Sequence, residues 1–317
     1  MNTIIAIQHL SKQYGKLTAL NDLTIEVEKG DVVGFIGPNG AGKTTTMRIL
    51  TTLLQPTLGQ AWLAGYSIID EPEQVRRVVG YMPDFFGVYE DMKVWEYLDF
   101  FAACYRLPLA SRDGLIDDLL SLVDLIHKRD AYVDSLSRGM KQRLCLARTL
   151  AHDPEVLILD EPASGLDPRA RIEMRELLRE LKNMGKTIFF SSHILSEVAD
   201  VCTKIAILEA GRLVAYGDMA EMKRQLRPNR LIRLQTLSDP LALQAFLATA
   251  EHVRDVRVGP DSGLPDGALR VEFSGEDQAL SALLTALIDR GFALTSFAEE
   301  SDNLEDVFMQ VTKGVVR

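Results

Sequence analysis

The amino-acid sequence predicts an α/β protein with a large domain, a helical subdomain within it and a smaller C-terminal α+β domain. From Asp31 to about Tyr216, short apolar runs alternate with helical stretches, which favours a largely parallel sheet flanked by helices. The pattern between about 84 and 150 is mostly helical and indicates a separate subdomain. After Gly217 the predicted elements follow the order βαββαβ, which is typical of a ferredoxin-like domain.

Four runs in the large domain are predicted to be buried strands, because each is short, apolar and bounded by turn residues. They are DVVGFIG, EVLILD, KTIFFSSH and KIAILEAG. The run DPRARIEMRELLRELKNMG, between the second and the third, is predicted to be a helix. Asp167 suits its N-cap, Pro168 its first turn and Gly185 the position after its end.

The change in the pattern of predicted elements after Gly217 also sets the expected domain boundaries. We expect the large domain to span 1–222 and the C-terminal domain to span 231–317, with the charged, Pro-containing segment 223–230 as the linker. The C-terminal domain is expected to end in a short helix that bears Leu304, Val307, Phe308 and Val311. No acid pair or nucleophile arrangement stands out in its sequence, so we expect a regulatory or dimerising role.

The composition, 47% hydrophobic and 25% charged, is that of an ordinary globular protein. The net charge of −10 argues weakly against a broad basic surface, and no nucleic-acid partner is expected. Cys104, Cys145 and Cys202 form no CxxC pair, so we expect buried thiols in a reducing compartment. Because no signal-peptide pattern and no run of about 18 apolar residues is present, we expect a cytoplasmic protein whose membrane role, if any, depends on a partner.

The segment GPNGAGKTT matches the phosphate-loop pattern G-x-x-x-x-G-K-[ST]. It follows the apolar strand VVGFI and opens the helix KTTTMRIL, which is the context that the pattern requires, so a plain Gly-rich turn is the weaker interpretation. Backbone N–H groups would surround the phosphates, the lysine would reach the β/γ oxygens and the first threonine would ligate Mg²⁺. The expected nucleotide-binding residues are Gly37, Pro38, Asn39, Gly40, Ala41, Gly42, Lys43, Thr44 and Thr45.

The run VLILDEP, Val156 to Pro162, places two carboxylates at the end of a buried strand, where ligands bind in open α/β sheets. Asp160 is predicted to hold Mg²⁺ through its water shell, and Glu161 is the candidate that polarises the attacking water. Taken alone, such a strand end is more often a sheet edge that meets solvent. The phosphate loop earlier in the chain favours the catalytic interpretation.

The stretch LSRGMKQ contains a second candidate anion site. Ser137 suits the N-cap of an amphipathic helix, whose first turn offers free N–H groups and the positive end of the dipole. Its apolar face would carry Met140, Leu144, Ala147 and Ala151. Without other information, Ser137 is more simply a helix cap.

These three elements, in this order, resemble the ATP-binding-cassette family over roughly residues 3–220. In that family two cassettes dimerise head to tail, and the signature helix of one caps the ATP bound by the phosphate loop of the other. The resemblance implies that Ser137 and Gly139 serve the ATP of a neighbouring copy. It also implies that Tyr14 stacks on adenine, that His193 contacts the γ-phosphate, and that the loop containing Asp167 signals between sites.

Two departures from the family pattern are evident. Arg138 and Gly139 stand where the family has a Gly-Gly pair, with Met140 in place of Gln, and we expect the signature to remain functional. Asp84 stands where the family has a Gln that reaches Mg²⁺ and water. A carboxylate still ligates Mg²⁺, so Thr44, Asp84 and Asp160 are the expected metal ligands and Asp84 joins Glu161 and His193 in the catalytic set. Its added negative charge leads us to expect slow hydrolysis unless a partner positions the loop.

The aromatic residues that follow Asp84 are Phe85, Phe86 and Tyr89. They fit either a binding surface for a partner's helix or core packing. The layout, with one cassette and an accessory domain ending LEDVFMQVTKG, resembles the ATP-binding subunits of two-component exporters. We therefore expect an ATPase that uses ATP and Mg²⁺, pairs with a second copy and drives a separate permease at the inner face of the membrane. A soluble cassette ATPase acting on ribosomes or DNA, and a P-loop kinase, are the alternatives.

Overall fold

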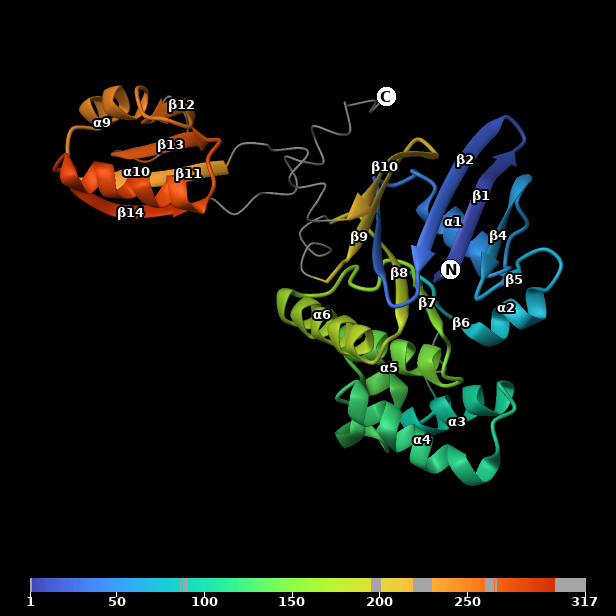
Figure 1. The fold of residues 1–317 in the computed structure, drawn as a ribbon. Coiled ribbons are helices and arrows are strands. Elements are labelled where there is room, and N and C mark those ends of the chain that lie inside the picture. Colours follow the sequence, from blue (N-terminus) through green and yellow to red (C-terminus); the bar gives the residue numbers. More distant parts are fainter. Residues whose placement is uncertain are drawn as a thin grey trace. The chain divides into compact units, whose positions relative to one another are not determined.

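A computed structural model describes residues 2–85, 87, 91–194, 201–218, 230–259, 265 and 267–299 of the chain. The chain divides into two compact units, whose described parts run from residue 2 to 218 and from 230 to 299. Figure 1 shows sheets with helices packed beside them in both units. The predicted linker, apart from Arg230, and the predicted last helix at 304–311 lie outside the described residues.

The larger unit is built around a six-stranded sheet with the strand order β10-β9-β3-β8-β7-β6. The strands from β9 to β6 are parallel, and β10 pairs antiparallel at the edge. Every residue of β3, β7 and β8 is buried, as expected for parallel strands covered on both faces. The four predicted strands are therefore confirmed. The six strands are β3 Val32–Ile36, β6 Val79–Met82, β7 Val156–Leu159, β8 Thr187–Ser192, β9 Lys204–Glu209 and β10 Arg212–Asp218.

A second, antiparallel sheet of the larger unit has the order β2-β1-β4-β5 and was not anticipated. Its buried side chains form one core cluster with those of the main sheet and of helix α1, Lys43–Leu50. This sheet therefore covers the helix that follows the phosphate loop, and it places the turn after β1 beside that loop. Its strands are β1 Thr3–Tyr14, β2 Leu17–Glu28, β4 Leu58–Leu63 and β5 Tyr66–Ser67.

The other helices of this unit are α2 Pro72–Val78, α3 Val94–Cys104, α4 Leu109–Leu122, α5 Arg138–Leu150 and α6 Pro168–Asn183, with 3₁₀ turns at Ile126–Lys128 and Val133–Ser135. The capping predictions for α6 are confirmed: the Asp167 carboxylate accepts from Ala170 N at 2.8 Å, and Gly185 has a φ of 82°. Helices α3, α4 and α5 pack together as the predicted helical subdomain, which Figure 1 shows below the main sheet.

The prediction that all three cysteines are buried is wrong for Cys104, which is exposed because the last turn of α3 faces solvent, and Cys202 is only partly buried. Cys145 in α5 is buried, and this burial raises the pKa of its thiol to about 11. Such a thiol is protonated and inert at neutral pH. Among the described residues, no helix combines the length and the apolarity needed to cross a membrane.

The smaller unit has the predicted βαββαβ order and forms an antiparallel sheet with the strand order β12-β13-β11-β14. Buried leucines of both helices pack with one face of the strands in a single core cluster. This topology confirms the ferredoxin-like prediction. Its elements are β11 Arg230–Thr236, α9 Pro240–Leu247, β12 Val253–Val258, β13 Ala268–Phe273, α10 Asp277–Asp289 and β14 Leu294–Glu299.

Candidate functional site

The phosphate loop connects the end of β3 to the first residue of α1, as the sequence predicts. Two of its glycines are required by close backbone contacts. A Cβ at Gly37 would lie 2.4 Å from the carbonyl oxygen of Leu208, and one at Gly42, where φ is 104°, would lie 2.6 Å from that of Ala19. The loop thus leads directly into a helix N-terminus, where N–H groups and the helix dipole favour an anion.

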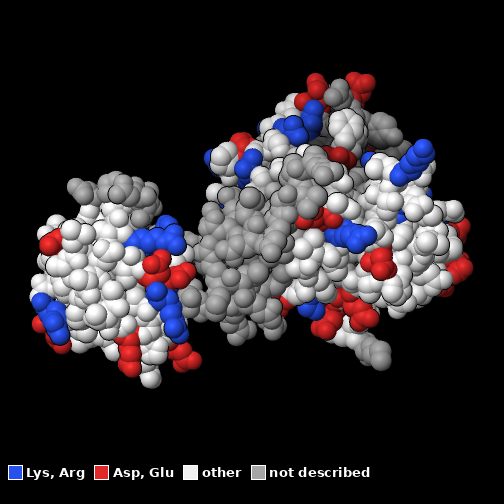
Figure 2. Space-filling view, turned by 90° about the horizontal axis from the view of Figure 1, so that it is seen from above, with Lys and Arg blue, Asp and Glu red and all other residues white. Residues whose placement is uncertain are grey.

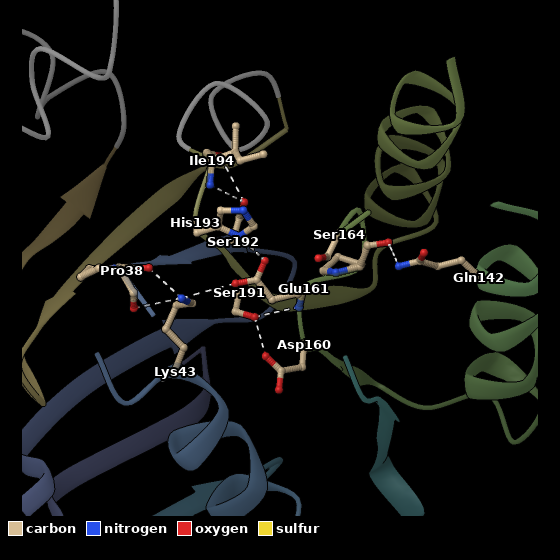
Figure 3. A network of polar contacts seen from close by, with 12 residues as sticks. Pro38, Lys43, Gln142, Asp160, Glu161, Ser164, Ser191, Ser192, His193 and Ile194 are labelled. Atoms are coloured by element: carbon tan, nitrogen blue, oxygen red, sulfur yellow. Dashed lines mark hydrogen bonds and ion pairs between the residues drawn. The ribbon is translucent and has the colours of Figure 1, made fainter. Parts of the chain in front are cut away.

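Lys43 is the buried cation of this loop, with 6% of its side chain exposed. Its Nζ donates to the carbonyl oxygens of Gly37 at 2.6 Å and Pro38 at 3.3 Å, and it lies 3.3 Å from Glu161 Oε1. Figure 3 shows the lysine between the loop and the end of β7. A buried charge needs such partners, and phosphate oxygens can replace them.

Asp160 and Glu161 follow β7 and contact the next strand, β8. The Ser191 hydroxyl donates to Asp160 Oδ1 at 2.7 Å and accepts from Glu161 N at 2.8 Å, so one buried serine orients both acidic residues (Figure 3). Glu161 has a φ of 50°, in the left-handed region that a side chain rarely adopts. Its Oε2 lies 2.6 Å from Nδ1 of His193, the residue that directly follows β8. Sequence reasoning did not single out Ser191, because a serine in a strand gives no signal until the group opposite it is known.

Asp160 is fully buried, and burial raises the pKa of its carboxyl group, while the hydrogen bond from Ser191 opposes the shift. Its Oδ2 is a buried oxygen with no hydrogen bond among the described residues. No cluster of three or more His, Cys, Asp or Glu side chains suited to a metal occurs in the described part of the chain. This donor set suits Mg²⁺, which binds one or two carboxylates and completes its shell with water and phosphate oxygens.

A cavity of about 530 Å³ brings most of the predicted nucleotide-site residues together. Tyr14, at the end of β1 and 48% exposed, lines it beside Leu17, Thr18 and Ala19. Asp84 also lines the cavity. Its carboxylate accepts from Phe85 N at 2.9 Å, and its charge contributes to the raised pKa of Asp160. The remaining lining residues are Pro38, Asn39, Gly40, Ala41, Gly42, Lys43, Thr44, Thr45, Glu161, Ser164 and His193.

The predicted signature residues lie in a different cleft, of about 520 Å³. Ser137 caps α5, where its hydroxyl accepts from Met140 N at 3.3 Å. Gly139 faces α6, since a Cβ at this position would lie 3.0 Å from that of Ala170. Asp167, the cap of α6, lines the same cleft, so the structure does not bring Ser137, Gly139 or Asp167 to the phosphate loop of their own chain.

Comparison with known proteins matches residues 20–164 to the family described as ABC transporter. Residues 217–312 match the C-terminal domain described as that of DrrA1-3-like ATP-binding proteins. The bacitracin transport ATP-binding protein BcrA of Bacillus licheniformis is 35% identical over 316 residues, which is 99% of each chain. The Nod factor export ATP-binding protein I of Cupriavidus metallidurans is 34% identical over 322 residues, the whole of both chains. The chain belongs to the ABC transporter family.

Solved structures agree with this assignment. An ATP-binding subunit of an ABC transporter superposes with a TM-score of 0.64 at 34% identity, covering 70% of this chain and 93% of its own. The cbiO1 protein of Clostridium perfringens, part of the ABC transporter complex cbiONQ, gives a TM-score of 0.64 at 27% identity over 72% of this chain and 94% of its own. The predicted α/β fold is thus confirmed as the fold of ABC ATP-binding subunits.

As an ABC transporter ATP-binding subunit, this chain binds ATP and hydrolyses it to drive transport. Its fold explains how a short loop, a strand end and a histidine far apart in sequence meet at one cavity. The parallel strands β3, β7 and β8 are neighbours, so their carboxyl ends deliver the loop, the Asp160–Glu161 pair and His193 to the same edge.

Proposed function

We propose that this ATP-binding subunit serves an exporter, and that two copies close head to tail on Mg·ATP to drive a separate permease. The observation that carries the proposal is the division of the predicted site between two clefts, one with the phosphate loop and one with Ser137. Because one chain cannot bring both to the same phosphates, a second copy supplies the missing half. The relative named for Nod factor export supports outward transport.

In this proposal, the residues of 37–45 bind the phosphates through backbone N–H groups and the α1 dipole. Lys43 exchanges its two carbonyl partners for phosphate oxygens. Tyr14 stacks on adenine, with Leu17 and Ala19 at the start of β2 as the apolar wall beside it. The neighbouring copy closes the site with the Ser137 end of its α5, and its Asp167 loop lies against the same interface.

Thr44 and Asp160 would hold Mg²⁺ directly or through its water shell, with Asp84 as a further carboxylate. The ion supplies neutralisation of triphosphate charge when bound. The unpartnered Oδ2 of buried Asp160 is the observation that supports this assignment. Ser191 keeps the other oxygen of the same carboxylate oriented.

Glu161 is the proposed base that orients the attacking water, a role that typically contributes about 10²–10⁴-fold to the rate. Its 2.6 Å contact with His193 fixes the carboxylate, and His193, 45% exposed, can also reach toward the γ-phosphate. When Lys43 turns to phosphate, Oε1 of Glu161 loses its contact at 3.3 Å and is free to accept a hydrogen bond from the attacking water. The remainder of the rate enhancement is positioning and electrostatic stabilisation.

The permease is proposed to bind at a groove of about 690 Å³ beside the helical subdomain. Phe101 and Tyr105 line it with three arginines, Arg48, Arg76 and Arg148. Phe85, close in sequence to the lining residue Pro83, is 82% exposed, which favours a partner contact over core packing for this residue. Phe86 and Tyr89, predicted alongside it, lie outside the described residues.

The domain assignment that accompanies this function is a nucleotide-binding domain at 1–222 and an accessory domain at 231–317. The boundary between the two compact units, after residue 219, supports a division near this linker. We place the protein in the cytoplasm at the inner face of the cell membrane, held there by its permease.

The test is ATP-dependent dimerisation of Glu161→Gln, measured by light scattering after gel filtration. We expect this variant to form a stable dimer with Mg·ATP, and Ser137→Ala in the same background to weaken it. Glu155→Gln is the matched control, because Glu155 precedes the same strand β7 and forms a surface ion pair with Lys29. A Glu161→Gln chain that stays monomeric would refute the composite site.

The same variant tests whether the chain binds a membrane permease. The tagged Glu161→Gln chain is captured from detergent-solubilised membranes with Mg·ATP, and the proteins that co-purify with it are identified by mass spectrometry. A polytopic membrane protein near one-to-one stoichiometry supports the transporter. Ribosomal proteins without a membrane companion would favour the soluble alternative, against which the net charge of −10 argues. On the face drawn in Figure 2, basic and acidic side chains are interspersed, without a broad basic area.

A further inference from the structure

Arg138 is the first residue of α5, directly after the capping Ser137, and its side chain lies against the segment that follows Glu161. A Cβ at Gly165, where φ is 67°, would lie 2.4 Å from Arg138 Nη2 and 2.5 Å from Cζ. The guanidinium group therefore rests on the backbone of this glycine. Its Nη2 also donates to the carbonyl oxygen of Ser164 at 3.3 Å.

One turn further along α5, Gln142 makes a second contact with the same segment. Its Nε2 donates to the carbonyl oxygen of Pro162, and its side chain is buried. Figure 3 shows Gln142 pointing from α5 toward the segment on which Glu161 and Ser164 lie. Because residues four apart share one face of a helix, Arg138 and Gln142 bind this segment side by side.

The bound segment begins immediately after Glu161, whose own backbone is in the left-handed region. Ser164 N donates to the carbonyl oxygen of Glu161 at 3.0 Å, and Ser164 lines the nucleotide cavity. A shift of the Arg138 end of α5 would thus be transmitted through Ser164 to the backbone of Glu161.

We infer that Arg138 is a positioning residue that couples the Ser137 end of α5 to Glu161 of the same chain. This inference rests on the proposed function, since it takes Ser137 as the contact to the neighbour's ATP and Glu161 as the base. Engagement of one ATP by α5 would then set the carboxylate at the other ATP. Among the described residues Arg138 has one hydrogen bond and no ion pair with a carboxylate, so the link is weak enough to form and break in each cycle.

The first variants are Arg138→Gly and Arg138→Lys, assayed for ATP hydrolysis by the full chain. We expect kcat to fall about fivefold and the Hill coefficient for ATP to approach one. The KM should change by less than about twofold, because the Arg138 guanidinium binds Gly165 and the Ser164 carbonyl rather than phosphate. Arg138→Lys should not restore kcat or the Hill coefficient, because lysine lacks the planar group that rests on Gly165. Full rescue by lysine, or a KM that rises while kcat holds, would identify a direct charge on phosphate and overturn the inference.

The second test is a double-mutant cycle with Gly165→Ala. The added Cβ displaces the guanidinium, so Gly165→Ala should lower kcat as Arg138→Gly does. In a chain that already carries Arg138→Gly, Gly165→Ala should lower kcat by a smaller factor. Additive losses would overturn the inference. Arg179→Ala is the matched control: Arg179 lies on α6 outside both clefts and pairs with Glu176 at the surface, and its removal should leave kcat unchanged.

Glu161→Gln separates this inference from the function on which it rests. If that variant retains turnover, the assignment of the base is wrong, whatever the Arg138 variants do. If it abolishes turnover while the cycle is additive, the proposed function stands and only the coupling through Arg138 is refuted.

Discussion

Replacing Ser191 with Ala tests the idea that one buried hydroxyl orients both acidic residues of the site. The substitution removes the donor to Asp160 Oδ1 and the acceptor of Glu161 N, at a position with no exposed surface. An unsatisfied buried polar group costs about 1–3 kcal/mol. Two such groups should lower the free energy of unfolding by roughly 3 kcal/mol, because water or a local rearrangement will replace part of the lost hydrogen bonding. The pKa of Asp160 should also rise further, because the hydrogen bond from Ser191 lowers it.

The assay is urea unfolding of the full chain followed by intrinsic fluorescence, with the m-value checked for constancy. Ser121→Ala is the control: this exposed serine of α4 bonds the Asp117 carbonyl of its own helix, and its loss should change stability by less than about 0.5 kcal/mol. If Ser191→Ala costs no more than the control, the serine does not hold the two acidic residues and the reasoning is refuted.

Three further predictions concern the nucleotide cavity. Asp160→Asn should raise the free energy of unfolding at pH 7 without Mg·ATP, because the raised folded-state pKa means that charged Asp160 opposes folding. This gain in stability should shrink as the pH falls toward 4, where the carboxyl group becomes protonated. Urea unfolding at both pH values measures the gain, and a gain that stays constant would contradict the prediction. Asp84→Gln should raise the basal ATPase rate by about two- to fivefold by removing a negative charge beside the phosphates, whereas unchanged basal and partner-stimulated rates would show that Asp84 is neutral. Tyr14→Ala should raise the KM for ATP by about tenfold with little effect on kcat, and Tyr14→Phe should not, since stacking needs only the ring.

The parts of the fold that sequence predicts well are those where local signals agree with the final environment. The buried strands β3, β7 and β8 are continuous apolar runs, and α6 has its cap, proline and terminal glycine in the expected places. The antiparallel sheet was missed because its alternation is interrupted. Strand β1 changes register with β2 between Ile7 and Leu10 and again near Lys12, so the period of two that identifies a half-buried strand is lost.

The residues of the site also differ in how well the sequence predicts them. The phosphate loop and the Asp160–Glu161 pair can be predicted because each motif carries its own strand and turn context. Ser191 and Gln142 cannot, because a serine in a strand or a glutamine on a helix has no signal until the opposing group is known. Their partners, Asp160 and the Pro162 carbonyl, are reached only through the packing of neighbouring elements.

The separation of the phosphate-loop cleft from the Ser137 cleft has a genetic consequence. In the proposed dimer each catalytic centre draws one half from each chain, so a defect in Lys43 and a defect in Ser137 damage opposite halves. A dimer of one chain with each defect would place both lesions in one centre and leave the other wholly intact. Two inactive alleles of this protein, expressed together, should therefore complement each other, and two copies of either allele should not.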